Sequence, residues 1–173
     1  MLDHKLYKIL IEVLDKKHFT QYPEDFSKRI IVQKTLYILT HGKDNRKLSL
    51  PYKWSFYLRG PYSSEIAHMI YYMNDYLPSL EENKSRIQLD EEEIKAISHF
   101  QDFRKALLSI DEEINEEDLF EIAATILYIS EQIGNDINKI TDKFEDFKPN
   151  LKQKISSDNF NKILDLMSQF NYI

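Results

Sequence analysis

Apolar residues recur every three or four positions along most of this chain of 173 residues, and this spacing limits the fold more than any other feature. It places apolar side chains on one face of an α-helix. In the segment 2–18, for example, Leu6, Leu10 and Leu14 share a face. The same pattern predicts helices over residues 28–41, 64–77, 91–108 and 116–133, with two or three short helices after residue 134.

Residues typical of helix ends flank these segments. Ser27 is a predicted N-cap of the second helix, and Gly42 fits a left-handed C-cap. Asp90 with Glu93 forms a capping-box-like start, and Gly134 ends the most apolar helix. The chain is therefore predicted to be mainly helical.

One segment departs from the helical period. Between Tyr52 and Arg59, aromatic and apolar residues alternate with polar ones, as in a strand with one buried face that would include Leu58. Gly60 and Pro61 then predict a strand-to-helix corner. The short segment 85–89 could pair with this strand and form a two-stranded β-ribbon.

Helices with one inserted ribbon predict a winged-helix-like N-terminal half followed by a helical extension. We place the division between residues 1–110 and residues 111–173, although both parts could form one single domain.

The chain lacks residues that several classes of protein require. The chain has no cysteine, which excludes disulfides, thiol nucleophiles and cysteine-ligated metals. Its five histidines lack metal-ligand spacing, and no glycine-rich phosphate loop or nucleophile motif occurs. Acidic clusters lie at predicted helix starts, where carboxylates cap helices. We therefore expect neither an enzyme nor a metal or cofactor site.

The N-terminal segment alternates charged and apolar residues, unlike a secretory signal, and no apolar run approaches the ~20 residues that span a bilayer. We expect a soluble cytoplasmic protein without a membrane partner.

Charge is distributed unevenly. Residues 1–62 carry a net charge of +6 and the remainder −12, within a total of −6. The basic side chains could form a nucleic-acid-binding face. They could equally attract the acidic half or only solvate the surface. The candidate nucleic-acid-binding residues are Lys28, Arg29, Lys43, Arg46, Lys47 and Lys53.

Two motifs carry a family resemblance. The segment 32–39 (VQKTLYIL), followed by 56–70 (FYLRGPYSSEIAHMI), resembles the paired signature of small YwgA-like proteins and the related SocA-like, or Panacea, antitoxin domain. The resemblance covers about residues 6–89. Arg59 stands where the antitoxin domain usually has an aromatic residue, so the second motif is closer to the YwgA-like branch. The matching residues are Gln33, Lys34, Leu36, Tyr37, Phe56, Tyr57, Gly60, Pro61 and Tyr62.

This resemblance implies a non-enzymatic binding module, often encoded on mobile elements or beside toxin and defence genes. Panacea-like members neutralise toxins by direct contact or act as proteolytic adaptors. We therefore expect a protein that binds a toxin, nuclease or phage-defence component. The predicted contact residues are Lys34, Tyr57, Arg59 and Tyr62, with Gly60 and Pro61 fixing the geometry.

Two alternatives remain open. A winged-helix transcriptional regulator would bind DNA through the basic half, and an acidic DNA mimic would inhibit a DNA-binding enzyme through the other half. A second copy of the chain is a further candidate partner.

Overall fold

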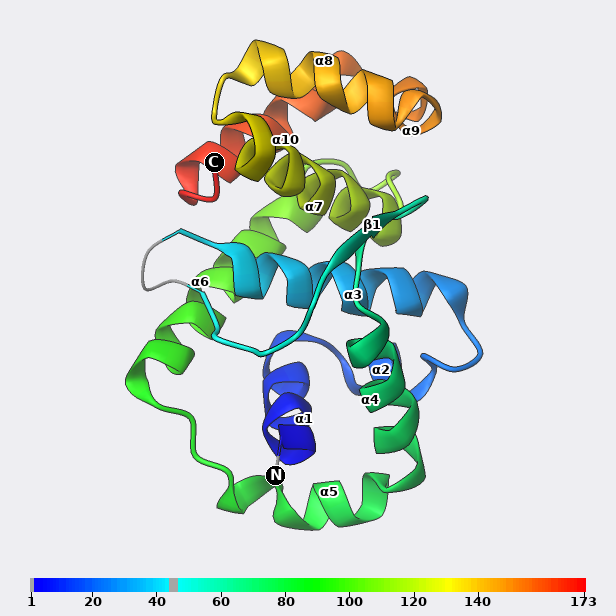
Figure 1. Cartoon of the computed structure of the whole chain (residues 1–173), viewed down its shortest axis with the longest axis vertical. Helices are drawn as coiled ribbons and strands as arrows, with labels where there is room; N and C mark the ends of the chain where they lie inside the picture. Colours follow the sequence, from blue (N-terminus) through cyan, green and yellow to red (C-terminus); the bar gives the residue numbers. More distant parts are fainter. Residues whose placement is uncertain (1, 44–46) are drawn as a thin grey trace.

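The computed structural model describes residues 2–43 and 47–173, in which helices predominate (Figure 1). The prediction of a mainly helical chain with a small two-stranded sheet is confirmed. The elements are α1 (Leu2–Val13), α2 (Lys16–Thr20), α3 (Phe26–His41), β1 (Ser55–Tyr57), β2 (Gly60–Tyr62), α4 (Ser64–Asp75), α5 (Leu77–Asn83), the short 3₁₀ helix η1 (Lys84–Arg86), α6 (Glu91–Leu108), α7 (Glu116–Ile133), α8 (Ile137–Phe147), α9 (Pro149–Lys154) and α10 (Ser157–Gln169).

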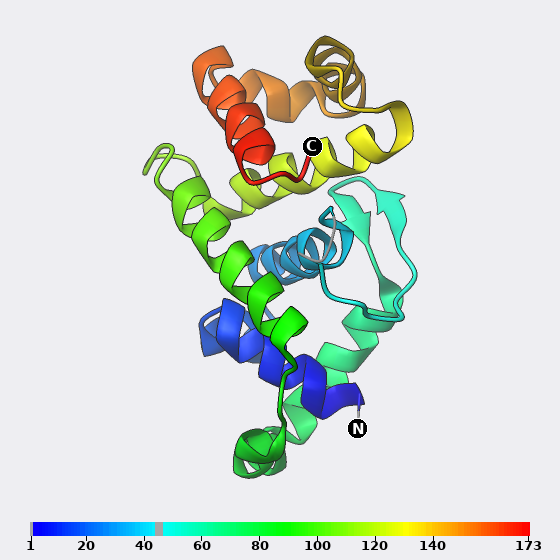
Figure 2. The same ribbon diagram turned by 90° about the vertical axis from the view of Figure 1, so that its left-hand side faces the viewer.

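Helix α3 crosses the middle of the molecule. Helix α1 lies on one side of it and α7 on the other, while α8, α9 and α10 cover the far side of α7 (Figure 1). Helix α6 runs from beside α1 towards α10 (Figure 2). Helix α6 thus connects the N-terminal helices with the C-terminal ones.

Side-chain caps begin five of the helices, α3, α4, α6, α8 and α10. The capping box of Asp90 and Glu93 is present at the start of α6, and Gly134 ends α7 with φ +87°. Two predicted caps are wrong. Asp25 caps α3 in place of Ser27 by accepting from the Lys28 backbone N–H at 3.2 Å, and Gly42 is extended, with φ −61° and ψ 163°, instead of left-handed. The first helix is also shorter than predicted, because α2 forms separately after Val13.

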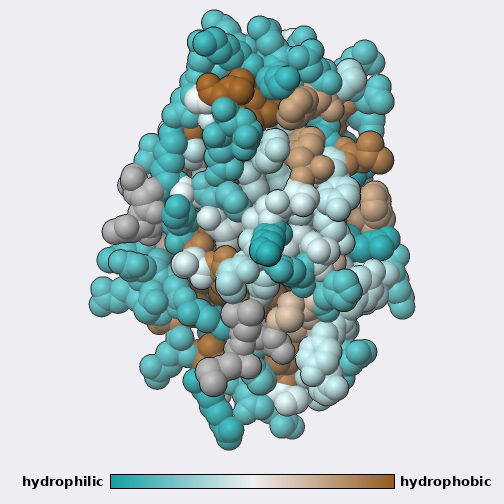
Figure 3. All heavy atoms as spheres, viewed as in Figure 1, coloured by the Kyte–Doolittle hydropathy of each residue, from teal (hydrophilic) through white to brown (hydrophobic). Residues whose placement is uncertain are grey.

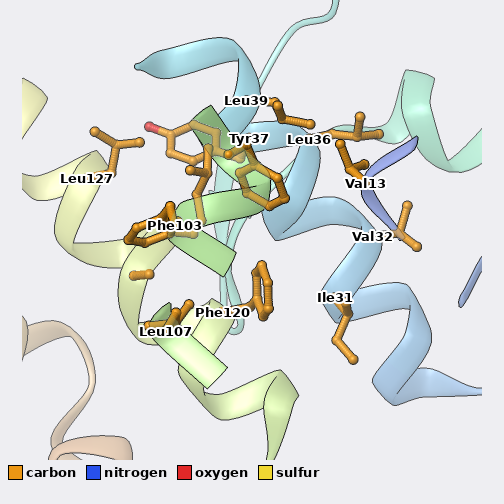
Figure 4. Close-up of a cluster of buried hydrophobic side chains, with 14 of the residues drawn as sticks. Val13, Ile31, Val32, Leu36, Tyr37, Leu39, Phe103, Leu107, Phe120 and Leu127 are labelled. Carbon is orange, nitrogen blue, oxygen red and sulfur yellow. The ribbon is translucent and has the colours of Figure 1, made fainter. Parts of the chain in front are cut away.

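The core draws on both parts of the chain. Figure 4 shows Val13 of α1 and Val32 of α3 on one side and Phe103 of α6 on the other, with the Tyr37 ring of α3 reaching towards Leu127 of α7. Tyr172 also packs its ring against that of Phe103, with centroids 4.7 Å apart. The division between residues 110 and 111 stays a prediction.

The sheet is a tight hairpin. β1 pairs with β2 antiparallel, with Tyr57 opposite Gly60, so Leu58 and Arg59 form the turn. The predicted pairing with residues 85–89 is wrong, because residues 84–86 form η1 and β2 takes that place. Gly60 and Pro61 therefore begin the second strand, where we expected a corner after the first. The winged-helix comparison stays a prediction.

The face seen in Figure 3 is mostly hydrophilic, with apolar surface at its right-hand edge over the free end of the hairpin. Leu58, in the hairpin turn, is 93% exposed, whereas the alternation had placed it on the buried face. In the part of the chain that the structure describes, no helix combines the length and apolar character needed to cross a membrane.

Candidate functional site

A pocket of about 480 Å³ opens between α3, α4 and the β-hairpin. We call it the hairpin pocket. It brings together five of the six predicted partner-binding residues, and the sixth, Pro61, contacts a lining side chain through its carbonyl. Its lining includes Arg29, Lys34, Tyr57, Arg59, Gly60 and Tyr62.

Lys34 lies on the inner wall of the hairpin pocket and is only 2% exposed. Its Nζ donates a hydrogen bond to the Pro61 carbonyl at 2.7 Å, which ties α3 to β2. Burial lowers the pKa of the Lys34 amine to about 7, although the nearby Glu121 carboxylate raises it. The amine therefore changes charge near neutral pH.

Gln33 fixes the end of the hairpin. Its side-chain amide donates to the Ser63 carbonyl at 3.0 Å, and its oxygen accepts from the Ser63 backbone N–H at 2.9 Å. This pair of bonds, with the bond from Lys34 to Pro61, joins the two motifs quoted above. Sequence reasoning had matched Gln33 to a motif but had assigned it no structural role.

A buried carboxylate holds the hairpin turn. Glu121 of α7 accepts from Arg59 Nε and, at 3.0 Å, from Lys148 Nζ. Lys148 also donates to the Leu58 carbonyl, and Arg59 Nη2 lies 3.5 Å from Asp118 Oδ1. The turn is therefore fixed to α7 and to the residue that precedes α9. The signal available in the sequence was a glutamate inside the apolar run of α7.

Glycine is required at position 60 for two reasons: the backbone conformation there and the close packing of α7 against it. Its φ of +89° lies in the left-handed region, and a Cβ there would lie 3.0 Å from Thr125 Oγ1. Any larger residue would strain the backbone of the hairpin, and its Cβ would crowd the Thr125 side chain of α7.

Three of the predicted contact side chains are accessible. Tyr57 is 59% exposed and packs edge-to-face on the half-buried Tyr62, with centroids 5.3 Å apart. The Arg59 side chain is 37% exposed although it is ion-paired. A partner can therefore reach this side of the hairpin, whereas it would meet Lys34 only inside the pocket.

Comparisons of the chain with family models, curated proteins and solved structures found no match. The resemblance to YwgA-like and SocA-like proteins therefore stays a prediction that rests on the motifs.

The predicted nucleic-acid-binding residues do not all come together. Arg29 lines the hairpin pocket, and Lys28 lies next to it at the start of α3. Lys43 and Lys47 lie beyond the other end of this 16-residue helix, roughly 20 Å away. Lys53 lies before β1, where its backbone N–H donates to Glu65 at 2.8 Å, and Arg46 is outside the described residues.

Among the described residues, no three histidine or carboxylate side chains gather in a group that could hold a metal ion. The buried His18 lies 3.4 Å from Oε2 of Glu116. The other carboxylate oxygen of Glu116, Oε1, pairs with Arg104. Partial burial would raise the pKa of Glu116, but the hydrogen bond from His18 and the Arg104 charge lower it to about 2. This cluster fixes α2 and α6 to the start of α7.

Proposed function

We propose that this chain is a non-enzymatic binding protein that captures another protein through its hairpin. The contact area would be the hairpin surface, defined as the exposed side chains of Phe26, Tyr57, Leu58 and Tyr71 around the mouth of the hairpin pocket. The motif resemblance supports a toxin, nuclease or phage-defence component as the partner, met in the cytoplasm by a winged-helix-like module.

The observation that carries this proposal is the 93% exposure of Leu58 on a turn that is held in place. A leucine in water forgoes about 1.5–3 kcal/mol of burial energy. Flexible loops often expose such residues singly, but this turn is fixed by the ion pairs of Arg59 and Lys148 with Glu121. A partner would therefore find the apolar side chain already in position.

The surrounding side chains fit a protein contact. Tyrosine, phenylalanine and arginine are enriched in the cores of protein interfaces, and tyrosine and arginine often contribute most of the binding energy. Tyr57 and Phe26 are more than half exposed on either side of the pocket, and the Arg59 guanidinium lies 5.9 Å from the centroid of the Phe26 ring.

Quantitative capture from a lysate of the native host tests the proposal. The immobilised wild type would be compared with Tyr57→Ser/Leu58→Ser. The control is Tyr76→Ser/Ile94→Ser, which removes an exposed tyrosine just after α4 and an exposed aliphatic side chain on α6. We expect proteins retained by the wild type and the control to be lost on the hairpin variant. Equal capture by all three proteins would contradict the proposal.

A further inference from the structure

The hairpin pocket contains two basic side chains, Arg29 and Lys34, that form no ion pair among the described residues. Its lining includes Arg29, Lys34 and Arg59 but no aspartate or glutamate. Among the described residues, the ion pairs of this region join Arg59 to Glu121 and Asp118, and none of them includes Arg29 or Lys34. Charge complementarity therefore favours an anionic occupant.

Arg29 and Lys34 also have N–H groups that donate no hydrogen bond in the described structure. The Arg29 Nη1 donates to the Tyr71 hydroxyl at a long 3.4 Å, and its buried Nε has no hydrogen-bond partner in the described structure. Lys34 carries three N–H donors, of which the bond to the Pro61 carbonyl uses one. A buried donor without a partner costs free energy, so an acceptor that entered the pocket would be stabilised.

The walls of the pocket are aromatic. Tyr22, Tyr57, Tyr62 and Tyr71 line it together with Phe26, whose ring centroid lies 5.2 Å from the Arg29 guanidinium. An apolar or aromatic group would pack against these rings, whereas a small inorganic anion would leave most of the wall uncovered. The volume is within the range of about 300–1,000 Å³ that is typical of ligand pockets.

We propose that the hairpin pocket receives an acidic peptide segment of the partner, whose carboxylate pairs with Arg29 and Lys34 while a neighbouring aromatic or aliphatic side chain packs on the tyrosines. A peptide fits better than a free small molecule because the apolar contact continues at the mouth of the pocket onto the exposed side chains of Leu58 and Phe26. This inference rests on the proposed function and names the chemistry that its partner presents.

Binding of this kind would depend on pH. Lys34 faces Glu121 from α7, Arg59 from the hairpin and Lys148 from the segment before α9, and burial lowers its pKa to about 7. A carboxylate binds the protonated amine more tightly, so binding raises that pKa. While the peptide carboxylate is ionised, affinity is then constant between about pH 5 and about pH 7 and falls as the pH rises above 7.

Selection from a phage-displayed library of short random peptides tests the inference on the full chain. The immobilised proteins would be the wild type, Arg29→Gln, and Arg86→Gln as the matched control on η1, with circular dichroism to verify folding. We expect the wild type and the control to enrich peptides that carry Asp or Glu beside an aromatic residue or leucine. Synthetic versions should bind Arg29→Gln roughly tenfold or more weakly.

Three results would overturn the inference. Enriched peptides could be basic or uncharged, the same acidic peptides could bind Arg29→Gln equally well, or the wild type could enrich no peptide at all. Duplex DNA that displaces the selected peptides and loses binding with Arg29→Gln would also overturn it, in favour of a nucleic-acid ligand. If the lysate capture depends on Leu58 while no acidic peptide is selected, this inference fails and the proposed function stands.

Discussion

At the scale of single residues, a comparison of Gly60 with Gly134 separates backbone strain from steric crowding. Both have a left-handed φ, +89° and +87°, that an L-residue rarely adopts. A Cβ on Gly60 would crowd Thr125 Oγ1 at 3.0 Å, whereas a Cβ on Gly134 would meet nothing within 4 Å. Gly134 is therefore a matched control for backbone strain without crowding.

We expect Gly134→Ala to lower the free energy of unfolding by about 1–3 kcal/mol, the usual cost of such backbone strain. Gly60→Ala should lower it further, because the new Cβ would also crowd the Thr125 side chain of α7. Urea denaturation followed by circular dichroism measures both changes. A loss for Gly60→Ala no larger than that for Gly134→Ala would contradict the close packing of β2 on α7.

Lys34 should make stability depend on pH. Its pKa falls from an ordinary value of 10.5 to about 7 in the folded chain. Between these values the unfolded chain binds more protons, so the free energy of unfolding rises with pH, by at most about 1.4 kcal/mol per pH unit. Below about pH 7 both states hold the proton and this slope disappears.

The Lys34→Met variant isolates this effect, because the other titrating groups are retained. We expect the wild type to gain stability relative to Lys34→Met as the pH rises from about 7 to about 10. Urea denaturation across this range measures the difference. Parallel pH profiles for the two proteins would show that the amine titrates normally and is not desolvated.

At the scale of elements, the hairpin is held by long-range contacts. Glu121 accepts from Arg59 and Lys148, and its carboxylate is buried. Removing one partner of a buried ion pair costs about 3–5 kcal/mol because the other charge remains buried. The orientation of Leu58 therefore depends on a residue 63 positions away in the sequence, Glu121.

We expect Glu121→Gln to lower the free energy of unfolding by about 3 kcal/mol or more. Glu145→Gln is the control, because Glu145 pairs with Lys152 at 3.4 Å on the surface and should contribute at most about 1 kcal/mol. Adding Lys148→Met to Glu121→Gln should restore part of the loss by removing the uncompensated charge. A double variant less stable than Glu121→Gln alone would contradict this explanation.

The sequence predicted those elements of the fold that depend on local interactions. Helices α6 and α7 follow from apolar spacing and capping residues, which act within a few positions. The hairpin partner was missed because Leu58-Arg59 is not a standard turn pair and a proline inside a strand is uncommon. The motifs identified the residues around Gly60, but Glu121 and Lys148 reach the site only through tertiary packing.

At the scale of the whole molecule, the core is continuous across the predicted division at residues 110 and 111. α3 packs along α7, and Phe103 of α6 packs against Tyr172 near the C-terminus. Isolated parts would expose these apolar faces to water. We therefore expect the chain to unfold as one cooperative unit.

Differential scanning calorimetry tests this expectation. A single transition should appear, with a calorimetric enthalpy close to the van't Hoff enthalpy. Two resolved transitions would instead show that residues 1–110 and 111–173 are separate domains.

The central claim is that the partner contacts the hairpin turn, and photo-cross-linking in the native host tests it most directly. One variant would carry benzoylphenylalanine in place of Leu58. A second variant would carry it in place of Ile94, an exposed residue on α6. Irradiation should cross-link a protein partner from position 58 and not from position 94. A partner that is cross-linked from position 94 alone, or equally from both positions, would contradict the account.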